Sequence, residues 1–518
     1  MVRKMNVFTK ITALVCTIAL ATGLLAGCGK GTQNSGGTVS TTPAANETKK
    51  PVEVKLILPY SDEVPSDAPL LPELNKLANA DFKIEWTPMI SYNDKFNVLM
   101  ASNQLPDALV VPDLKLSVYV NGARAGMFWD LTSYMDKYPN FKNFNPIVIT
   151  NSSLEGKQYV LPRERILKRK LVAYRADWAK KAGLKAPDTI ENLYAMAKAF
   201  GTGDFDGNGK NDTIGLLLGT VNNEIDCFDA LVTAFGGPNK WGVKDGKVVP
   251  NFMTKEYMDT MKWLKRMFDE KLISSDFAIT KTTQQITDFV DKEKSGLWLN
   301  YGIPGTADPL LKQKQQADAN VKRGDIFEYT YLKGPDGKPR IPAEDGMSGG
   351  FAFPKQTVKD EARLKDILSV FDKLQSQEGQ RLLNNGIEGK HFTIFQDKFI
   401  KSIDANVNKK EIASYGQMGM SGNLTYMTAD DDIGMRLQKD RNTFAATDLI
   451  PNVSTPLMSD SYTSNKANLD KIINEAQFKF IMGQMSEDQF NQAIEQWKKS
   501  GGDKAIEEYT AAYAKAKK

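Results

Sequence analysis

The sequence predicts an α/β protein built from two lobes. Strand-like alternation and helical periodicity follow one another from residue 52 onward, and the same succession begins again at residue 171. About 490 residues follow an N-terminal export segment, which is too long a chain for one hydrophobic core and long enough for two. These observations together predict two α/β units in one chain.

The first unit opens with apolar residues that alternate with mostly polar ones over residues 52–58, which predicts a strand. A helix over 70–79, a strand over 82–86, a helix over 92–102 and a strand over 105–111 are expected to follow. Strands separated by helices usually pair in parallel, because each helix carries the chain back to the same edge of the sheet. The first lobe should therefore contain a largely parallel sheet.

The rest of the chain continues this alternation. The predicted elements are a hairpin over 155–162 that leads into a segment crossing between the lobes, a strand over 171–175, helices over 176–183, 189–200 and 255–271, a short strand that ends in a glycine loop near residue 302, a turn over 334–338, a strand over 347–353, a helix over 360–375, and a helical tail with a capping box at Ser486 and Gln489.

The N-terminal segment predicts export. Basic residues Arg3, Lys4 and Lys10 stand at the start, and an apolar run over 11–25 follows that is too short to be a comfortable membrane span. The run ends in the sequence Leu-Ala-Gly-Cys at positions 25–28, which resembles the lipobox of bacterial lipoproteins. An ordinary secretory signal with an incidental cysteine is the alternative.

The lipobox resemblance implies a lipid anchor. In such proteins the cysteine thiol carries a diacylglycerol and the chain is cut just before it, so residues 1–27 are expected to be a lipoprotein signal peptide and Cys28 the lipidation site. Residues 28–50 are small and polar and are predicted to form a flexible tether. The folded protein is then expected on the extracellular face of the cell membrane.

Composition excludes several classes of function. The chain has 67 basic and 63 acidic residues, and removal of the three basic residues in the signal leaves 64 against 63, so a nucleic-acid partner is not expected. Of the three cysteines, Cys16 leaves with the signal and Cys28 carries lipid, so Cys227 has no disulfide partner. The single histidine, His391, makes a His-rich metal site impossible.

Residues 204–212 have the spacing of an EF-hand-type calcium loop. The predicted ligands are the side chains of Asp204, Asp206, Asn208 and Asp212 and the backbone carbonyl of Lys210, with Gly209 at the turn. Calcium is a hard ion that prefers oxygen ligands, and such a loop can present every second residue inward. Position 12 holds Gly215 instead of Glu, so another carboxylate, a water or Thr213 must complete the shell. A solvated turn is the alternative.

Five segments carry a resemblance to a known family. These are residues 101–107, 155–159, 174–178, the loop at 204–212 and residues 385–392. In this order after a lipobox, they resemble the lipoprotein solute-binding proteins of bacterial ABC sugar importers, extracellular solute-binding family 1. The similarity is greatest to the large oligosaccharide-binding branch, which includes alginate-oligosaccharide binders.

This resemblance implies a periplasmic-binding-protein-like fold, in which two lobes are joined by a hinge crossed about three times. Lobe 1 would comprise residues 51–165 and 345–405, and lobe 2 residues 166–344 and 406–518. It also implies a structural calcium ion, an oligosaccharide in the cleft between the lobes, and an ABC transporter permease as partner. The branch usually has an acidic residue where this chain has Thr213, which bears on the calcium shell.

A sugar site needs flat aromatic groups beneath the apolar face of each pyranose ring and planar hydrogen-bonding groups around its rim. The candidates are Trp298 and Tyr301, then Trp129 and Tyr92, as stacking platforms, and Arg163 and Arg165, near the first crossing between the lobes, as groups that grip hydroxyls or a carboxylate.

The main prediction is a monomeric, non-enzymatic receptor without catalytic residues. A surface-anchored glycoside hydrolase is one alternative, because the chain has carboxylates enough for the required pair. A sensory lipoprotein that reports sugar to a membrane kinase is the other.

Overall fold

The computed structural model describes residues 50–517, except residues 62, 64–68, 282–288, 290–291, 306–307, 397–398, 422–426 and 429–430. The chain divides into two units, Met1–Lys49 and Lys50–Lys518, and the fold below is that of the second. The predicted signal peptide, Cys28 and nearly all of the predicted tether lie outside the described residues.

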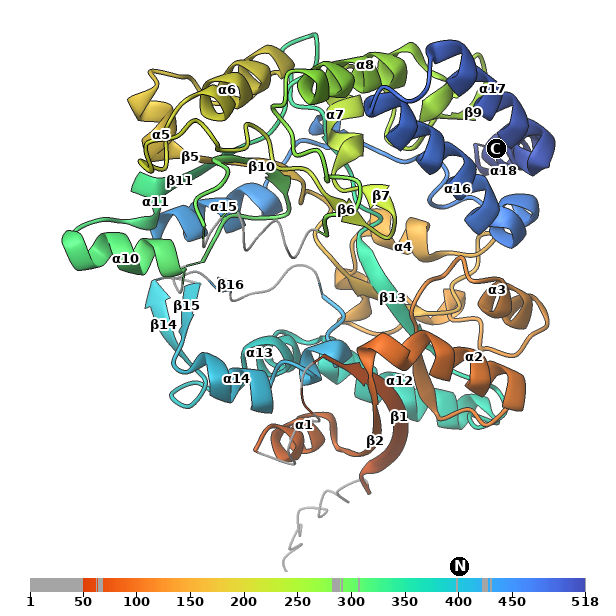
Figure 1. The fold of residues 1–518 in the computed structure, drawn as a ribbon. Helices are drawn as coiled ribbons and strands as arrows, with labels where there is room; N and C mark the ends of the chain where they lie inside the picture. Colours follow the sequence, from red (N-terminus) through yellow and green to blue (C-terminus); the bar gives the residue numbers. More distant parts are fainter. Residues whose placement is uncertain are drawn as a thin grey trace, which may run out of the picture. The chain divides into compact units, whose positions relative to one another are not determined.

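A five-stranded sheet organises the first half of the fold (Figure 1). Its strands, in spatial order, are β2 (Ala80–Pro88), β1 (Val52–Tyr60), β3 (Ala108–Val111), β13 (Met347–Ala352) and β4 (Leu161–Glu164). Strand β1 runs parallel to β2 and β3, as predicted, whereas β13 is antiparallel to both β3 and β4. A strand from the middle of the chain therefore completes a sheet begun at its start.

Helices cover this sheet and form the first hydrophobic core with it. They are α1 (Leu70–Ala78), α2 (Tyr92–Ser102), α3 (Ser117–Arg124), α4 (Pro146–Ser152), α12 (Glu361–Gln375) and α13 (Gln377–Asn385). Helix α12 begins where the Asp360 carboxylate accepts the Arg363 amide, and it buries Leu364, Ile367 and Phe371 against the sheet side of the core. Local capping and periodicity explain this helix.

A three-stranded antiparallel sheet organises the second half. Its strands are β10 (Leu297–Asn300), β5 (Leu171–Arg175) and β11 (Phe327–Thr330). Because side chains alternate along a strand, Leu297 and Leu299 enter the larger core of this half. Trp298 enters a smaller core on the opposite face, where helix α15 (Asp432–Asn442) packs. Both faces of this sheet are therefore covered.

The helices of the second half are α5 (Ala176–Lys181), α6 (Ile190–Thr202), α7 (Phe228–Ala234), α8 (Lys255–Asp269), α10 (Pro309–Ala317), α11 (Arg323–Ile326), α16 (Asp460–Ile481), α17 (Glu487–Trp497) and α18 (Asp503–Ala516). The small sheets are β6 (Thr220–Val221) with β7 (Glu224–Ile225), β8 (Trp241–Lys244) with β9 (Lys247–Pro250), β12 (Ile341–Pro342) with β17 (Leu449–Ile450), and β14 (Phe392–Gln396) with β15 (Phe399–Ser402) and β16 (Met427–Thr428); helix α14 (Ala405–Glu411) follows β15. Two predicted caps are confirmed: Thr189 caps α6, and Ser486 forms a capping box at α17. Among the described residues, no helix is both long and apolar enough to cross a bilayer.

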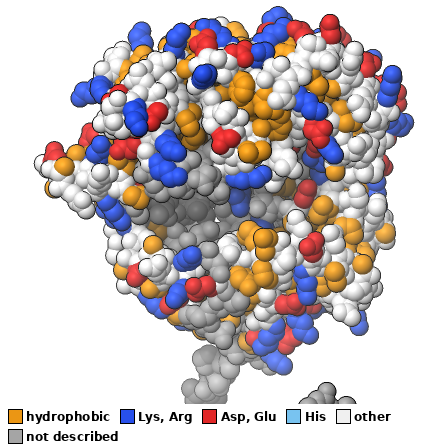
Figure 2. Space-filling model, in the orientation of Figure 1, with side chains coloured by type: hydrophobic (Ala, Val, Ile, Leu, Met, Phe, Trp, Pro, Cys, Tyr) orange, Lys and Arg blue, Asp and Glu red, His pale blue; other side chains and the backbone are white. Residues whose placement is uncertain are grey.

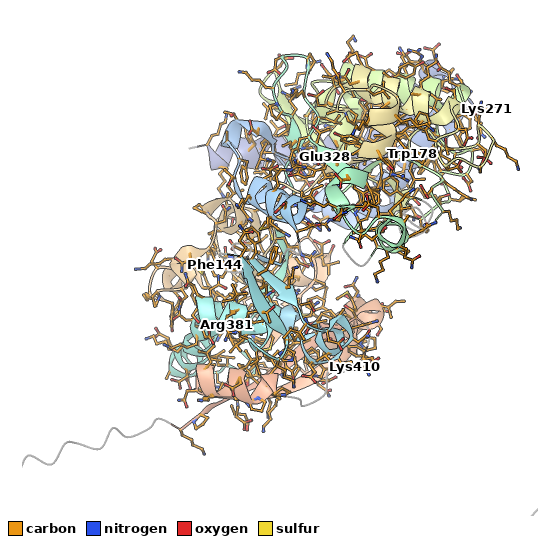
Figure 3. All side chains as sticks on the ribbon, turned by 90° about the vertical axis from the view of Figure 1, so that its left-hand side faces the viewer. Phe144, Trp178, Lys271, Glu328, Arg381 and Lys410 are labelled. Carbon is orange, nitrogen blue, oxygen red and sulfur yellow. The ribbon has the colours of Figure 1, made fainter. Side chains whose placement is uncertain are left out.

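The two cores belong to two side-chain bodies, one carrying Trp178 and Glu328 and the other Phe144 and Arg381 (Figure 3). The segments that connect them lie side by side. Their backbone hydrogen bonds join Arg165 N to Gly346 O at 2.7 Å, Glu344 N to Leu167 O at 3.0 Å, and Glu164 N to Met420 O at 3.1 Å. The two-lobed α/β architecture predicted from the sequence is thus present, with its connections gathered in one place.

One part of the chain packs differently from the expectation. Ile412, Tyr415, Met418 and Met420 belong to the first core, although the sequence interpretation assigned residues 406–518 to the second lobe. The reason is an aromatic contact across the core: the ring of Tyr415 meets that of Trp86 edge to face, with centroids 5.4 Å apart.

Candidate functional site

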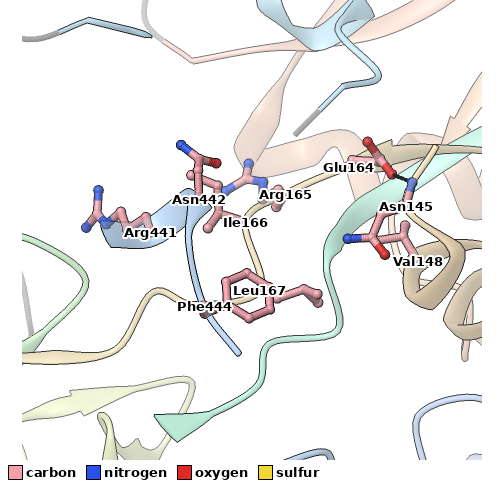
Figure 4. A pocket seen from close by; sticks show the side chains of 9 residues that line it. All are labelled: Asn145, Val148, Glu164, Arg165, Ile166, Leu167, Arg441, Asn442 and Phe444. Carbon is pink, nitrogen blue, oxygen red and sulfur yellow. Dashed lines mark hydrogen bonds between the residues drawn. The ribbon is translucent and has the colours of Figure 1, made fainter. Parts of the chain in front are cut away.

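A pocket of about 120 Å³ lies beside the connecting segments (Figure 4). Its lining residues are Asn145, Val148, Glu164, Arg165, Ile166, Leu167, Arg441, Asn442 and Phe444. They come from the start of α4, from the first connecting segment, and from the end of α15 with the loop that follows it. The pocket therefore joins groups from the first half of the fold to groups from the second.

Local structure positions one wall of this pocket. Asn145 caps helix α4, because its side chain accepts the Ile147 amide at 2.9 Å and Pro146 occupies the first helical position. The backbone amide of Asn145 in turn donates to the Glu164 carboxylate (Figure 4). Val148, one turn further along α4, adds an apolar surface.

The two predicted arginines have different roles. Arg163 is buried, and its guanidinium donates to the Ser348 carbonyl at 2.9 Å and to the Gln417 side chain. Burial, together with the nearby charge of Arg165, lowers the pKa of Arg163 to about 10. Arg163 therefore ties protein segments together and is corrected from a ligand contact to a structural residue. Arg165, by contrast, is exposed and lines the pocket.

Tyr301 lies next to the pocket rather than in its lining. The guanidinium carbon of Arg169 lies 4.9 Å from the centre of the Tyr301 ring, and Arg441 donates to the Tyr301 carbonyl. The Tyr301 hydroxyl lies 3.3 Å from Asp226 Oδ1. Burial, followed by the nearby Cys227 thiol, raises the pKa of the Tyr301 phenol. Tyr301 is thus held between two arginines at the edge of the site.

Trp298 was the leading predicted stacking platform, and the structure corrects this. Its side chain is 4 % exposed, and its ring packs on that of Phe289 with centroids 4.8 Å apart. The physical reason is that helix α15 covers the face of the sheet to which Trp298 points. A buried ring cannot stack on a sugar without local opening of the core.

Tyr92 is also a core residue. It is 3 % exposed, and its hydroxyl bridges strands β1 and β3 by lying 3.1 Å from the carbonyls of both Ile57 and Val110. Trp129 is half-buried at the edge of the first core, where its indole N–H donates to the Val358 carbonyl at 2.8 Å. Neither ring lines the pocket.

The predicted calcium loop has its acidic groups facing one another. The Asn208 amide nitrogen donates to Asp206 Oδ2 at 2.8 Å and to Asp212 Oδ1 at 2.9 Å, so a donor occupies the space between two carboxylates. Burial raises the pKa of Asp206, and the carboxylates of Asp204 and Asp212 raise it further. Gly209 has a φ of +82°, as the turn requires.

Two observations limit that loop. Among the described residues, no group of three or more His, Cys, Asp or Glu side chains is arranged to hold a metal ion. Thr213, a possible extra ligand from the sequence, is buried, and its hydroxyl donates to the carbonyls of Phe200 and Gly203 at the end of α6. Any additional calcium ligand must therefore come from elsewhere.

The sequence interpretation missed the residues that follow α15. Arg441, Asn442 and Phe444 supply a cation, an amide and a ring to the pocket. A charged and an amide residue followed closely by an aromatic residue at a helix end is a weak local signal. Nothing in that signal indicates that this helix end meets a segment more than 270 residues earlier in the chain.

Comparison with known proteins places the chain in a family. A family model described as bacterial extracellular solute-binding protein matches residues 61–381. Lipoprotein LipO of Bacillus subtilis (strain 168) is 36% identical over 511 residues, which cover 96% of this chain and 98% of LipO. The polygalacturonan/rhamnogalacturonan-binding protein YtcQ of the same organism is 32% identical over 512 residues, with coverage of 98% and 99%.

A solved structure supports the fold. The Streptococcus pneumoniae ABC-transporter substrate-binding protein FusA in complex with kestose aligns with a TM-score of 0.65 at 20% identity, covering 90% of this chain and 99% of FusA. An EF-hand mutant of FusA aligns with a TM-score of 0.64. The family predicted from the sequence motifs is confirmed by the family model and by the two Bacillus relatives, which match over nearly their full length. The chain belongs to the bacterial extracellular solute-binding protein family.

Proposed function

We propose that the protein is a receptor that captures an oligosaccharide between its two lobes and delivers it to the permease of an ABC importer. The observation that carries this proposal is the pocket beside the connecting segments. It combines the apolar Phe444, Leu167 and Val148 with hydrogen-bonding groups such as Asn442 and Arg165, the combination that pyranose rings require. The names of YtcQ and FusA point to the same ligand class.

The position of the pocket suggests how binding would change the protein. A ligand shifts an equilibrium between open and closed lobes only if it contacts the closed state better. A sugar in this pocket would touch residues from both halves of the fold, so it would favour closure. We propose that lobe 1 comprises residues 51–165 and 345 to Met420 and that lobe 2 comprises 166–344 and the remainder, which revises the boundary at 405.

A binding role without catalysis, in a monomer, is part of the proposal. Among the described residues that line the pocket, Glu164 alone has a carboxyl group, whereas glycoside hydrolysis needs two. The test incubates the protein with neutral and acidic oligosaccharides and measures the melting temperature and the products. A higher melting temperature with intact sugar supports the receptor; cleaved sugar would establish the hydrolase.

We also propose that Cys28 carries a lipid that holds the protein on the outer face of the cell membrane. The lipobox and the tether support this, and LipO is named a lipoprotein. Replacing Cys28 with Ala should release the protein from the membrane fraction or leave the signal uncut. Unchanged retention and processing of that variant would contradict the proposal.

Calcium is proposed as a structural ion of the loop at 204–212. The clustered carboxylates of Asp204, Asp206 and Asp212 fit the ion, because their mutual repulsion already favours a bound proton at Asp206. Asn208 and the Lys210 carbonyl would complete the loop's contribution. When bound, calcium would neutralise these charges and stabilise the folded state.

A titration measures this directly. Calcium should raise the melting temperature of the wild-type protein and should not raise that of an Asp204→Ala, Asp206→Ala double variant. Magnesium serves as the control ion, since it prefers a stricter octahedral shell. Equal responses of the two proteins would show that the loop is only a turn.

A further inference from the structure

Three arginines converge at the edge of the pocket around Tyr301. Arg165 and Arg441 both line the pocket, although they come from different segments of the chain. Arg441 also donates to the Tyr301 carbonyl, and the guanidinium of Arg169 lies 4.9 Å from the Tyr301 ring centre. The tyrosine therefore links the third arginine to the two that face the pocket.

The charge of these arginines is not neutralised by the protein. Among the ion pairs formed within the described part of the chain, none includes Arg165, Arg169 or Arg441. Burial lowers the pKa of both Arg165 and Arg441, and the like charge of Arg169 lowers it further. The Nε of Arg441 is buried and has no hydrogen-bond acceptor among the described residues.

The carboxylates nearby already have donors in the protein. Glu344 pairs with the Lys170 ammonium at 3.1 Å, and Glu164 accepts the backbone amide of Asn145. Asp345 accepts a backbone amide at 3.1 Å, and burial raises its pKa, which weakens its negative charge. A net positive charge therefore remains at this side of the pocket. On the face drawn in Figure 2, Lys and Arg side chains border the hollow in the middle of the molecule.

We propose that this pocket binds an acidic oligosaccharide and that Arg165, Arg169 and Arg441 hold the carboxylate of a uronic acid unit. The inference rests on the proposed function, since it names the class of sugar for the same site. A guanidinium offers two parallel N–H donors that match the two oxygens of a planar carboxylate. The ring of that unit would lie toward Phe444, with Asn442 available to its hydroxyls.

The test compares sugars that differ only in charge. Isothermal titration calorimetry is run with α-1,4-linked galacturonic acid trimer, its methyl ester, the neutral galactose trimer and a sulfated galactose trimer. We expect the acid to bind at least about 10-fold more tightly than its ester, because a hydrogen bond to a charged group is worth roughly 1.5–3 kcal/mol. Added salt should weaken the binding of the acid far more than that of the ester.

Substitutions then locate the contact. Arg441→Gln and Arg165→Gln should each weaken binding of the acid about 10- to 100-fold and leave the affinity for the ester nearly unchanged. Arg441→Lys should recover only part of the loss, since an ammonium cannot bind both oxygens in parallel. Arg266→Gln is the matched control, because Arg266 is an exposed arginine on α8 that pairs with Glu270.

The outcomes separate this inference from the proposed function. Binding of the neutral sugars with no preference for the acid would overturn the acidic ligand and leave the sugar receptor intact. Equal losses for acid and ester in the arginine variants would also overturn it, as would tighter binding of the sulfated trimer. If none of these sugars, nor any in the broader oligosaccharide panel, binds or shifts the melting temperature, both proposals fail.

Discussion

Replacing Trp298 with Ala should lower the stability of the protein and leave its sugar affinity unchanged. The side chain is 4 % exposed and packs on Phe289, whose ring lies 6.0 Å from that of Phe327. Removing a buried tryptophan loses its transfer energy and leaves a cavity, which costs about 3–5 kcal/mol. That is a large share of the stability of an ordinary domain.

A second variant tests the reasoning further. The indole N–H of Trp298 has no acceptor among the described residues, so Trp298→Phe removes an unsatisfied donor while keeping an aromatic ring. Its cost should therefore be smaller than that of Ala by about 2 kcal/mol or more. Urea unfolding followed by circular dichroism gives the stability, and calorimetry gives the affinity per folded molecule. An alanine variant with wild-type stability and lost sugar binding would refute the core assignment.

Three further results are expected from unfolding measurements. Lys170→Met should cost about 3–5 kcal/mol, because it leaves the buried Asp229 carboxylate without its cation, whereas Lys170→Arg should recover part of the loss. Burial lowers the pKa of Lys115 from 10.5 to about 8 beside the Leu457 carbonyl, so the unfolded chain binds more protons in that window. Stability should then rise by about 1–3 kcal/mol from pH 8 to 10.5, an increment that Lys115→Met removes. Tyr92→Phe should cost about 1–2 kcal/mol with unchanged sugar affinity; a loss of affinity alone would contradict its place in the core.

Elements that depend on neighbouring residues were predictable. The helix predicted over 92–102 has the same limits as α2, and the strand over 171–175 coincides with β5. Thr189 and Ser486 cap helices as predicted, because a cap joins residues two or three positions apart. The parallel pairing of the first three strands also followed from their alternation with helices.

Candidate site residues depended on more than local pattern. Alternation along β10 indicated that Trp298 faces away from Leu297, and a sheet with one solvated face would have exposed it. Whether that face meets solvent depends on α15, which begins more than 130 residues later. The sequence could therefore identify an aromatic residue on a strand but could not decide whether anything covers it.

The sequence by itself determined the family, the two-lobed α/β class and the local limits of most helices and strands. Tertiary structure decided which side chains meet at the pocket: Arg165 faces it, Arg163 is buried beside it, and Arg441 arrives from the far end of the chain. The physical reason is the range of the interactions. Caps and periodic faces are set within a few residues, whereas burial depends on the packing of segments hundreds of residues apart.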